Sequence, residues 1–326
     1  MKTIKTLLAS IALLLCSETM NAHDFEVDGI YYNILSENNK TVEVTFEGDT
    51  YSSKANEYAD SVTIPQKVDY EGNEYAVTGI GTEAFRACFK LLSVNIPDGV
   101  VIIRERAFYE CRKLSFVVIP EGVTSIGSSA FSGCTSLASV VIPEGVTSIG
   151  SSAFSDCTSL TSVVIPEGVT SIGWYAFEDC TSLASVVIPE GVTSIGGWAF
   201  QDCTSLTSVV IPEGVTSIGG WAFSKCTSLT SVKSLSSEEP EIYTSDRSTF
   251  GSISMNAILY IPEGASYPNW EPYFSKVEYL TEEEITGIED VMPEVRKSVI
   301  YDINGLRVKD PVKGGIYIID GEKVKL

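Results

Sequence analysis

A repeat of 23 residues constrains this chain more than any other feature of its sequence. Cysteines recur at this interval from Cys88 to Cys226, and phenylalanines keep step with them from Phe85 to Phe223. An eighth phenylalanine, Phe250, follows after four extra residues. A fixed period of this length predicts an array in which each unit buries its apolar face only against its neighbours. We therefore expect a repeat solenoid rather than a single globular core.

The unit that begins at Cys134 illustrates how one turn of the solenoid forms. Its first stretch predicts a strand with three inward-facing side chains, Leu137, Val140 and Ile142. Pro143 ends this strand because it lacks a backbone donor, and the Glu-Gly that follows completes a type I turn. Residues 146–149 form a second short apolar stretch, after which Ala153 and Phe154 are expected to begin a tight, 3₁₀-like turn. Each unit is therefore predicted to be mostly β with a short helical turn.

These repeating residues resemble the BspA-like leucine-rich repeats of bacterial surface proteins, whose unit reads C-x-x-L-x-x-V-x-I-P-x-x-V-x-x-I-G-x-x-A-F. The resemblance covers about residues 61–265. It implies a curved, right-handed, mostly β solenoid that is exported and used for binding. Relatives have been linked to adhesion to host matrix proteins and to other cells, so the resemblance implies a class of ligand without naming one.

The first 22 residues have the pattern of a signal peptide. Lys2 and Lys5 form a basic start, residues 7–16 are apolar except for Ser10, and cleavage after Ala22 is expected. A lipid anchor on Cys16 is the alternative, and it is disfavoured because a leucine rather than a small residue precedes this cysteine. No later segment is apolar enough to span a membrane. The chain is therefore expected to be exported, to the cell surface or outside the cell, with the periplasm as a further possibility.

The remaining chain divides into four predicted parts. Residues 23–60 are expected to form an N-terminal β cap, and residues 61–280 the solenoid. An aromatic cap closes the solenoid, with Trp270 as a lid rather than a ligand platform. Residues 281–291 have the acidic composition of a linker. Residues 292–326 contain Y-D-x-x-G-x-x-V and G-x-Y-I-I, a pattern that resembles C-terminal sorting domains of type IX secretion; a simple β cap is the alternative.

The charge balance excludes several classes of function. The chain has 22 basic and 43 acidic residues, a formal net charge of −21 and a single histidine, His23. Nucleic-acid binding begins with a basic surface, which this chain lacks. One histidine excludes most histidine-based catalytic and metal sites, and neither a G-x-S-x-G nor an S-x-x-K motif is present. We therefore expect a protein that is not an enzyme and that has no cofactor or metal.

The function that this pattern favours is adhesin-like binding of a protein or glycan on a host or neighbouring cell. A passive spacer or surface-coat element is the structural alternative, since the repeats are nearly identical. A glycan-active enzyme is less favoured, because hydrolysis of a glycosidic bond needs two carboxylates that converge about 5–10 Å apart. Stacked identical turns give no reason to expect such a pair.

Two sets of residues are candidates for binding. The first is a strip of valines expected on the outer face of the strands, called the valine strip here: Val118, Val141, Val164, Val187 and Val210. The second precedes the Ala-Phe pair, where Tyr175, Trp198 and Trp221 are expected to stack on successive turns, with Trp174 beside them. Flat aromatic side chains can stack on sugars or anchor a protein contact. The alternative for these aromatics is a structural role over the neighbouring turn.

Two further ladders are expected to be structural. The seven periodic cysteines are predicted to be free, buried thiols, because residues stacked in register place their Cβ atoms too far apart for a disulfide. A row of acidic residues follows the Ile-Pro pairs and is predicted to lie on exposed turns: Asp98, Glu121, Glu144, Glu167, Glu190 and Glu213. A line of single carboxylates does not converge as a calcium site requires.

Overall fold

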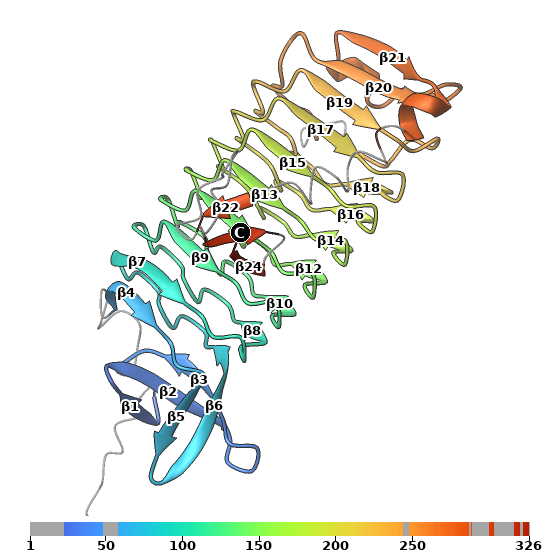
Figure 1. The fold of residues 1–326 in the computed structure, drawn as a ribbon. Coiled ribbons are helices and arrows are strands. Elements are labelled where there is room, and N and C mark those ends of the chain that lie inside the picture. Colours follow the sequence, from blue (N-terminus) through green and yellow to red (C-terminus); the bar gives the residue numbers. More distant parts are fainter. Residues whose placement is uncertain are drawn as a thin grey trace, which may run out of the picture.

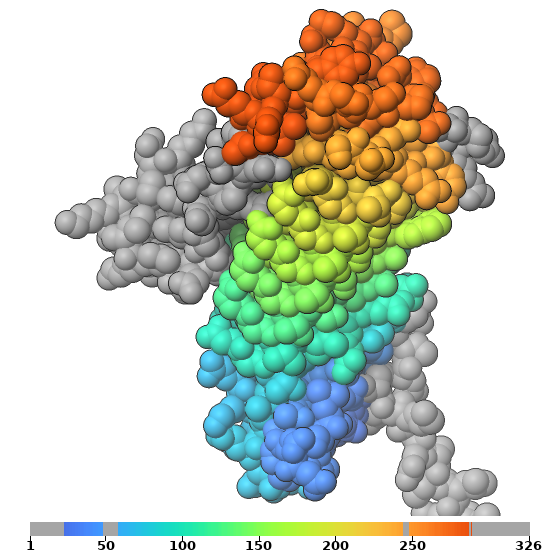
Figure 2. All heavy atoms as spheres, turned by 90° about the vertical axis from the view of Figure 1, so that its right-hand side faces the viewer, coloured from blue at the N-terminus to red at the C-terminus, as the bar shows by residue number. Residues whose placement is uncertain are grey.

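The computed structural model describes residues 23–47, 58–243, 248–286 and 288, and the backbone of three strands between residues 300 and 325. The expected signal peptide and most of the expected sorting segment lie outside the described residues. The repeats form a stack of turns, called rungs here (Figure 1). In Figure 2 the colours follow one another along the stack in chain order, so each rung contacts mainly the rungs before and after it.

One side of the stack is a parallel sheet built from the second apolar stretch of each unit. Its two-residue strands pair in register, as in Ile149↔Ile172 and Ile172↔Ile195. These strands are β8 (Ile102–Ile103), β10 (Ser125–Ile126), β12 (Ser148–Ile149), β14 (Ser171–Ile172), β16 (Ser194–Ile195) and β18 (Ser217–Ile218).

A second side carries the longer strands. Identical residues pair here too, as in Val140↔Val163. One ladder contains β4 (Ala59–Thr63), β7 (Lys90–Asn95) and β9 (Phe116–Val118). The next contains β11 (Ser139–Val141), β13 (Ser162–Val164), β15 (Ser185–Val187), β17 (Ser208–Ile211), β19 (Ser231–Ser234), β20 (Ile258–Pro262) and β21 (Lys276–Leu280). The predicted repeat solenoid is confirmed.

Tight turns close the third side of each rung. The amides of residues 152, 154 and 156 donate to carbonyls 174, 176 and 178 of the next rung, at 2.7–2.8 Å. The amides between them donate to the carbonyl three residues earlier, which is the bond expected of a 3₁₀-like turn. Ser152 and Asp156 have φ values of 55° and 58°. These two left-handed residues stop the turn from continuing as a helix.

The core runs through the centre of the stack. Its main component is a column of buried phenylalanine rings with centroids 4.9–5.6 Å apart and interplanar angles of 1–8°. The rings are Phe85, Phe108, Phe131, Phe154, Phe177, Phe200, Phe223 and Phe250. Buried Leu, Val, Ile and Ala side chains surround the column. A core residue of one rung therefore packs directly on the equivalent residue of the next rung, 23 positions later in the regular repeats.

The seven periodic cysteines are buried and free, as predicted. Each thiol from Cys111 onward also donates a hydrogen bond to a phenylalanine carbonyl of the preceding rung, for example Cys157 Sγ to Phe131 O at 3.3 Å. Burial raises the pKa of these six thiols well above 9.0, and that of Cys226 to about 12. Cysteine fits here because it is small, apolar and a weak donor.

Short β structure covers the first rung. Strands β1 (Phe25–Val27), β2 (Ile30–Ser36) and β3 (Thr41–Thr45) pair antiparallel, and β3 continues in parallel into β6 (Asn73–Ile80). β6 also forms a hairpin with β5 (Lys67–Tyr70). β4 crosses the boundary expected after residue 60 and pairs with β7. The ring of Tyr58 lies 4.6 Å from that of Phe85 and ends the phenylalanine column.

The other end of the column is covered by aromatic residues. Trp270 is fully buried, with its ring 5.0 Å from Phe250, and its Nε1 donates to the carbonyl of Pro240 at 3.1 Å. This indole therefore belongs to the core rather than to a ligand surface. It precedes a short 3₁₀ helix, η2 (Glu271–Tyr273), which leads into β21.

The segment after the solenoid contains a helical turn and three strands. Residues 282–286, in the expected acidic linker, are helical, and the side chains of Thr281 and Glu284 cap the helix start. β22 (Ile300–Asp302), β23 (Ile316–Ile319) and β24 (Glu322–Lys325) form an antiparallel sheet. Among the described residues, no helix has the length and apolar character needed to cross a membrane.

Candidate functional site

The valine strip is less exposed than the sequence predicts. Val141, Val164 and Val187 are direct register neighbours on β11, β13 and β15. All five valines of the strip are half-buried, so the expectation of an exposed strip is corrected. Side chains on one face of a parallel sheet stack on one another and cover part of their neighbours' surface. The strip is a uniform surface with little apolar area accessible on each rung.

The aromatic residues before the Ala-Phe pairs stack as predicted. The ring of Trp198 lies 4.8 Å from Tyr175 and 4.6 Å from Trp221, with interplanar angles of 16° and 31°. All three residues are half-buried and have φ values of 57–58°. Ser129 and Ser152 occupy the same position of earlier rungs with φ of 55°. The left-handed backbone is therefore a property of the rung and does not depend on an aromatic side chain.

Trp174 differs from the other three aromatic residues. Its side chain is 55% exposed, and its ring lies 5.6 Å from Trp198 at an angle of 39°. The equivalent residues of the next two rungs are Gly197 and Gly220. A Cβ built on Gly197 would lie 3.6 Å from the ring of Trp174. The indole thus extends over the glycine of the next rung, where no side chain competes for the space.

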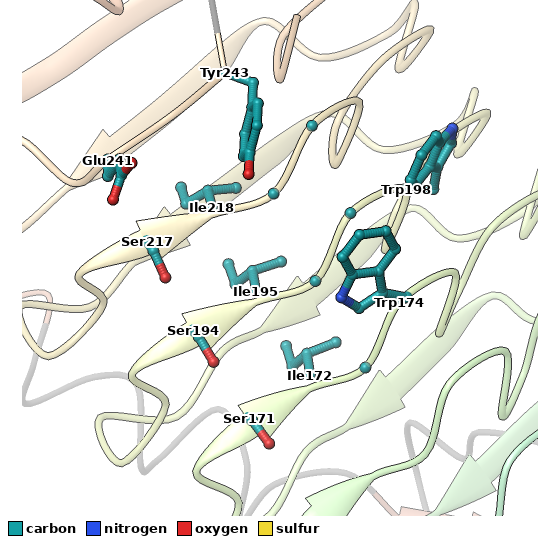
Figure 3. Close-up of a pocket in the computed structure, with 15 residues that line it drawn as sticks. Ser171, Ile172, Trp174, Ser194, Ile195, Trp198, Ser217, Ile218, Glu241 and Tyr243 are labelled. Atoms are coloured by element: carbon teal, nitrogen blue, oxygen red, sulfur yellow. The ribbon is translucent and has the colours of Figure 1, made fainter. Parts of the chain in front are cut away.

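A groove of about 490 Å³ lies over β14, β16 and β18, beside these residues (Figure 3). A row of serines lies along one side, and Trp174 and Trp198 lie along the other. Buried isoleucines and backbone glycines separate the two sides. A Cβ on Gly219 would lie 2.3 Å from the amide nitrogen of Gly197, so the preceding rung leaves no room for a side chain at this position. The serines are Ser171, Ser194 and Ser217.

The remaining side of the groove is formed by the segment before Phe250, where four extra residues interrupt the repeat. The backbone of Glu241 pairs with β18: its carbonyl accepts from Ile218 N at 2.8 Å, and its amide donates to Thr216 O at 2.9 Å. Tyr243, two residues later, is half exposed. Thr249 holds it in place: Tyr243 N donates to Thr249 Oγ1 at 3.2 Å, and that hydroxyl donates to Gly219 O at 3.1 Å.

The structure therefore divides the four aromatic candidates. Trp174 and Trp198 line the groove, whereas Tyr175 and Trp221 are not among its lining residues and lie on either side of Trp198. Sequence reasoning missed Glu241, Tyr243 and the serine row. The four-residue insertion before Phe250 marks the first two, because the chain leaves the repeat register there after seven phenylalanines in step. The serines recur in each rung from Ser125 to Ser217 and carry no local signal.

The acidic row after the Ile-Pro pairs is exposed at every position, from Asp98 to Glu213. Within the ranges that the structure describes, no three His, Cys, Asp or Glu side chains are grouped so as to hold a metal ion. The prediction of exposed turn residues is confirmed.

A second acidic row, which the sequence did not single out, lies on the turn side. Burial raises the pKa of Glu178, and the charges of Asp179 and Asp156 raise it further. Burial also raises the pKa of Asp179, with Asp202 and Asp156 adding to the effect. Lys225 of the next rung pairs with Asp202 at 3.0 Å, which neutralises one end of the row.

These shifts predict a pH-dependent stability. A carboxyl whose folded pKa is raised destabilises the fold when ionised, so this cost disappears as the pH falls through the folded pKa values. Glu178→Gln should therefore raise the free energy of unfolding at pH 7 by about 0.5 kcal/mol, and by nothing once the pH is below the ordinary glutamate value of 4.5. Urea denaturation at several pH values measures this. Glu144→Gln on an exposed turn is the control, and an equal gain in both variants would contradict the explanation.

Comparison with known proteins decides the family. The model of the BspA type leucine rich repeat region matches in six copies, over residues 78–207 and 149–267, which together are more than half of the chain. The chain belongs to this family. BspA-type repeats are a protein-interaction family, generally without enzymatic activity and typical of surface proteins.

Solved structures of leucine-rich-repeat proteins are similar to this BspA-type chain. The T. pallidum leucine rich repeat protein is 30% identical, covering 63% of this chain and 90% of its own, with a TM-score of 0.54. A leucine-rich repeat protein from Bacteroides ovatus is 27% identical over 79% and 77%, with a TM-score of 0.40. A leucine rich cell surface protein from Faecalibacterium prausnitzii is 24% identical over 81% and 96%, with a TM-score of 0.45. Among curated protein sequences, none matches.

Proposed function

We propose that this chain is an exported, adhesin-like protein of the cell surface, which binds a macromolecule of a host or neighbouring cell and catalyses no reaction. The observation that carries the proposal is the groove over β14, β16 and β18. It combines an exposed indole, a row of hydroxyls and one carboxylate in a volume that suits a small ligand or part of a larger one. Membership of a surface-protein family supports the same conclusion.

The composition of the groove argues against a glycan-active enzyme. Hydrolysis of a glycosidic bond needs two carboxylates about 5–10 Å apart. Of the described residues that line the groove, Glu241 is the single acidic one. The groove therefore has the groups for binding and lacks the second group for hydrolysis.

The proposal that the chain is exported is based on the sequence patterns at its two ends. Residues 1–22 have the pattern of a signal peptide, and residues 292–326 resemble a type IX sorting domain. Expression in a host with that secretion route tests both. The intact chain should reach the outer surface beginning at residue 23, and removal of residues 292–326 should leave it in the periplasm. If the shortened chain still reaches the surface, residues 292–326 are not needed for sorting and form a simple β cap.

Binding by the mature chain, residues 23–326, tests the adhesin function directly. An array of matrix proteins, mucins and glycans at low and physiological salt should give a saturable signal that survives the higher salt. The variant Trp174→Ser/Trp198→Ser should lose it and still fold, because serine occupies both positions in earlier rungs. Tyr279→Ser, at an exposed aromatic residue of β21, is the control and should bind normally. A folded protein that binds nothing would favour the passive spacer, for which the uniformity of the rungs argues.

A further inference from the structure

We propose that the ligand of the groove is a neutral oligosaccharide. This inference rests on the adhesin function proposed above and names the chemical class that the groove recognises. It is carried by the side chains that line the groove, by the charge around it and by the hydrogen bonds of its backbone.

The exposed indole of Trp174 provides a platform for a sugar ring. Trp174 is 55% exposed, and its ring is inclined by 39° to that of Trp198, 5.6 Å away. The apolar C–H face of a pyranose packs on the flat face of an indole, and it keeps its hydroxyls at the edge of the ring. Tyr175 and Trp221 cover the two faces of Trp198, so Trp198 is a fixed support beside Trp174 and not a second platform. Such fixed aromatic surfaces bind at a low cost in conformational entropy.

Hydroxyl groups lie on the opposite side of the groove from these indoles (Figure 3). Ser171, Ser194 and Ser217 stand on adjacent strands, so their spacing is that of neighbouring strands, about 4.8 Å. Each serine hydroxyl can both donate and accept a hydrogen bond, as can each hydroxyl of a sugar. Glu241 accepts and Tyr243 can do both, at the end of the groove nearest the insertion. A sugar chain that crosses β14, β16 and β18 in turn has the serine hydroxyls on one side and the indole of Trp174 on the other.

The charge of the groove selects neutral sugars. Its lining contains no lysine, arginine or histidine among the described residues, and its one charged side chain is that of Glu241. The whole chain carries a formal net charge of −21. A uronic acid, a sulfated sugar or a sialic acid would meet repulsion without a compensating cation.

The backbone of the groove disfavours an extended peptide. A peptide that adds to a sheet needs free backbone donors and acceptors at an edge. The amides of Gly173, Gly196 and Gly219 already donate to the preceding rung at 2.8–3.0 Å. Glu241 covers the edge of β18 through its own backbone bonds. The groups left for a ligand are side-chain hydroxyls, one carboxylate and the exposed indole of Trp174, which match a sugar better than a main chain.

Titration calorimetry of the mature chain with defined hexasaccharides tests the proposal. The neutral probes are cellohexaose, maltohexaose, mannohexaose and chitohexaose, and the anionic probe is hexagalacturonate. At least one neutral probe should bind saturably, and hexagalacturonate should not. Trp174→Ser should weaken the binding at least tenfold, whereas Tyr279→Ser should change it less than twofold. These two aromatic side chains are equally exposed, at 55% and 56%, so the pair separates the groove from exposed aromatic surface in general.

The outcomes separate this inference from the adhesin function. Binding of no neutral probe, or equal binding by Trp174→Ser and the unchanged chain, overturns the oligosaccharide proposal. If the mature chain then binds a matrix protein on the array, and Trp174→Ser/Trp198→Ser does not bind it, the adhesin function stands with a protein as its ligand. If nothing binds in either assay, both proposals fail. All variants should unfold at the same temperature as the unchanged chain, so that a loss of binding is not caused by a loss of folding.

Discussion

Replacing Phe154 by alanine is expected to lower the free energy of unfolding by about 3–5 kcal/mol. The Phe154 ring is fully buried between those of Phe131 and Phe177, 5.4 and 5.5 Å away and nearly parallel to both. Alanine would leave a cavity in the middle of the column, and the rungs cannot close it because their backbones are held apart by the sheet hydrogen bonds. Denaturation in guanidinium chloride measures the loss.

The effect should also divide the array. Each rung is stabilised mainly by its neighbours, so a weakened contact in the centre separates two halves of the solenoid. The unfolding transition of Phe154→Ala should therefore broaden or become biphasic. Phe116→Ser is the control, because Phe116 is half-buried on the outer face of β9 where five later rungs have serine, and it should cost less than about 1 kcal/mol. Similar losses in both variants would contradict the importance of the column.

Replacing Trp270 by alanine is expected to have an effect of similar size, about 3–5 kcal/mol, at the end of the stack. The buried indole covers Phe250, the last ring of the column, and its Nε1 donates to Pro240 O. Without it the core of the last rungs is open to water, and terminal rungs of a repeat protein need such a cover to stay soluble. Thermal unfolding and light scattering should report a lower transition temperature and association of the variant.

Trp270→Phe distinguishes the two contributions of this indole. Phenylalanine keeps most of the buried area but leaves the carbonyl of Pro240 without its donor, so we expect a smaller loss of about 1–3 kcal/mol. This variant should remain monodisperse, because the end of the column stays covered. If Trp270→Phe associates as strongly as Trp270→Ala, the hydrogen bond to Pro240 rather than the cover is what keeps the end closed.

The repeat makes the core predictable from the sequence. Residues 23 positions apart lie directly above one another, so the main contacts of the core can be read from the period of the sequence. The phenylalanine column, the buried free cysteines and the exposed acidic row all follow from this. The exposure of the valine strip did not follow, because it depends on how far each side chain is covered by the same residue of the next rung.

The candidate site was predictable only in part. Trp174 and Trp198 were visible as departures from an otherwise uniform repeat, and the structure places both on one groove. Their partners came from elsewhere: Gly197 and Gly220 supply the space by lacking a side chain, and the insertion brings Glu241 and Tyr243 to the edge of β18.

The sequence by itself therefore determined the solenoid, its core and the family, because each depends on contacts that repeat at one fixed separation along the chain. Only the tertiary structure decided where a ligand can bind. A groove depends on side chains of several rungs and on the spaces between them, and no periodic signal records a missing side chain or the path of an insertion.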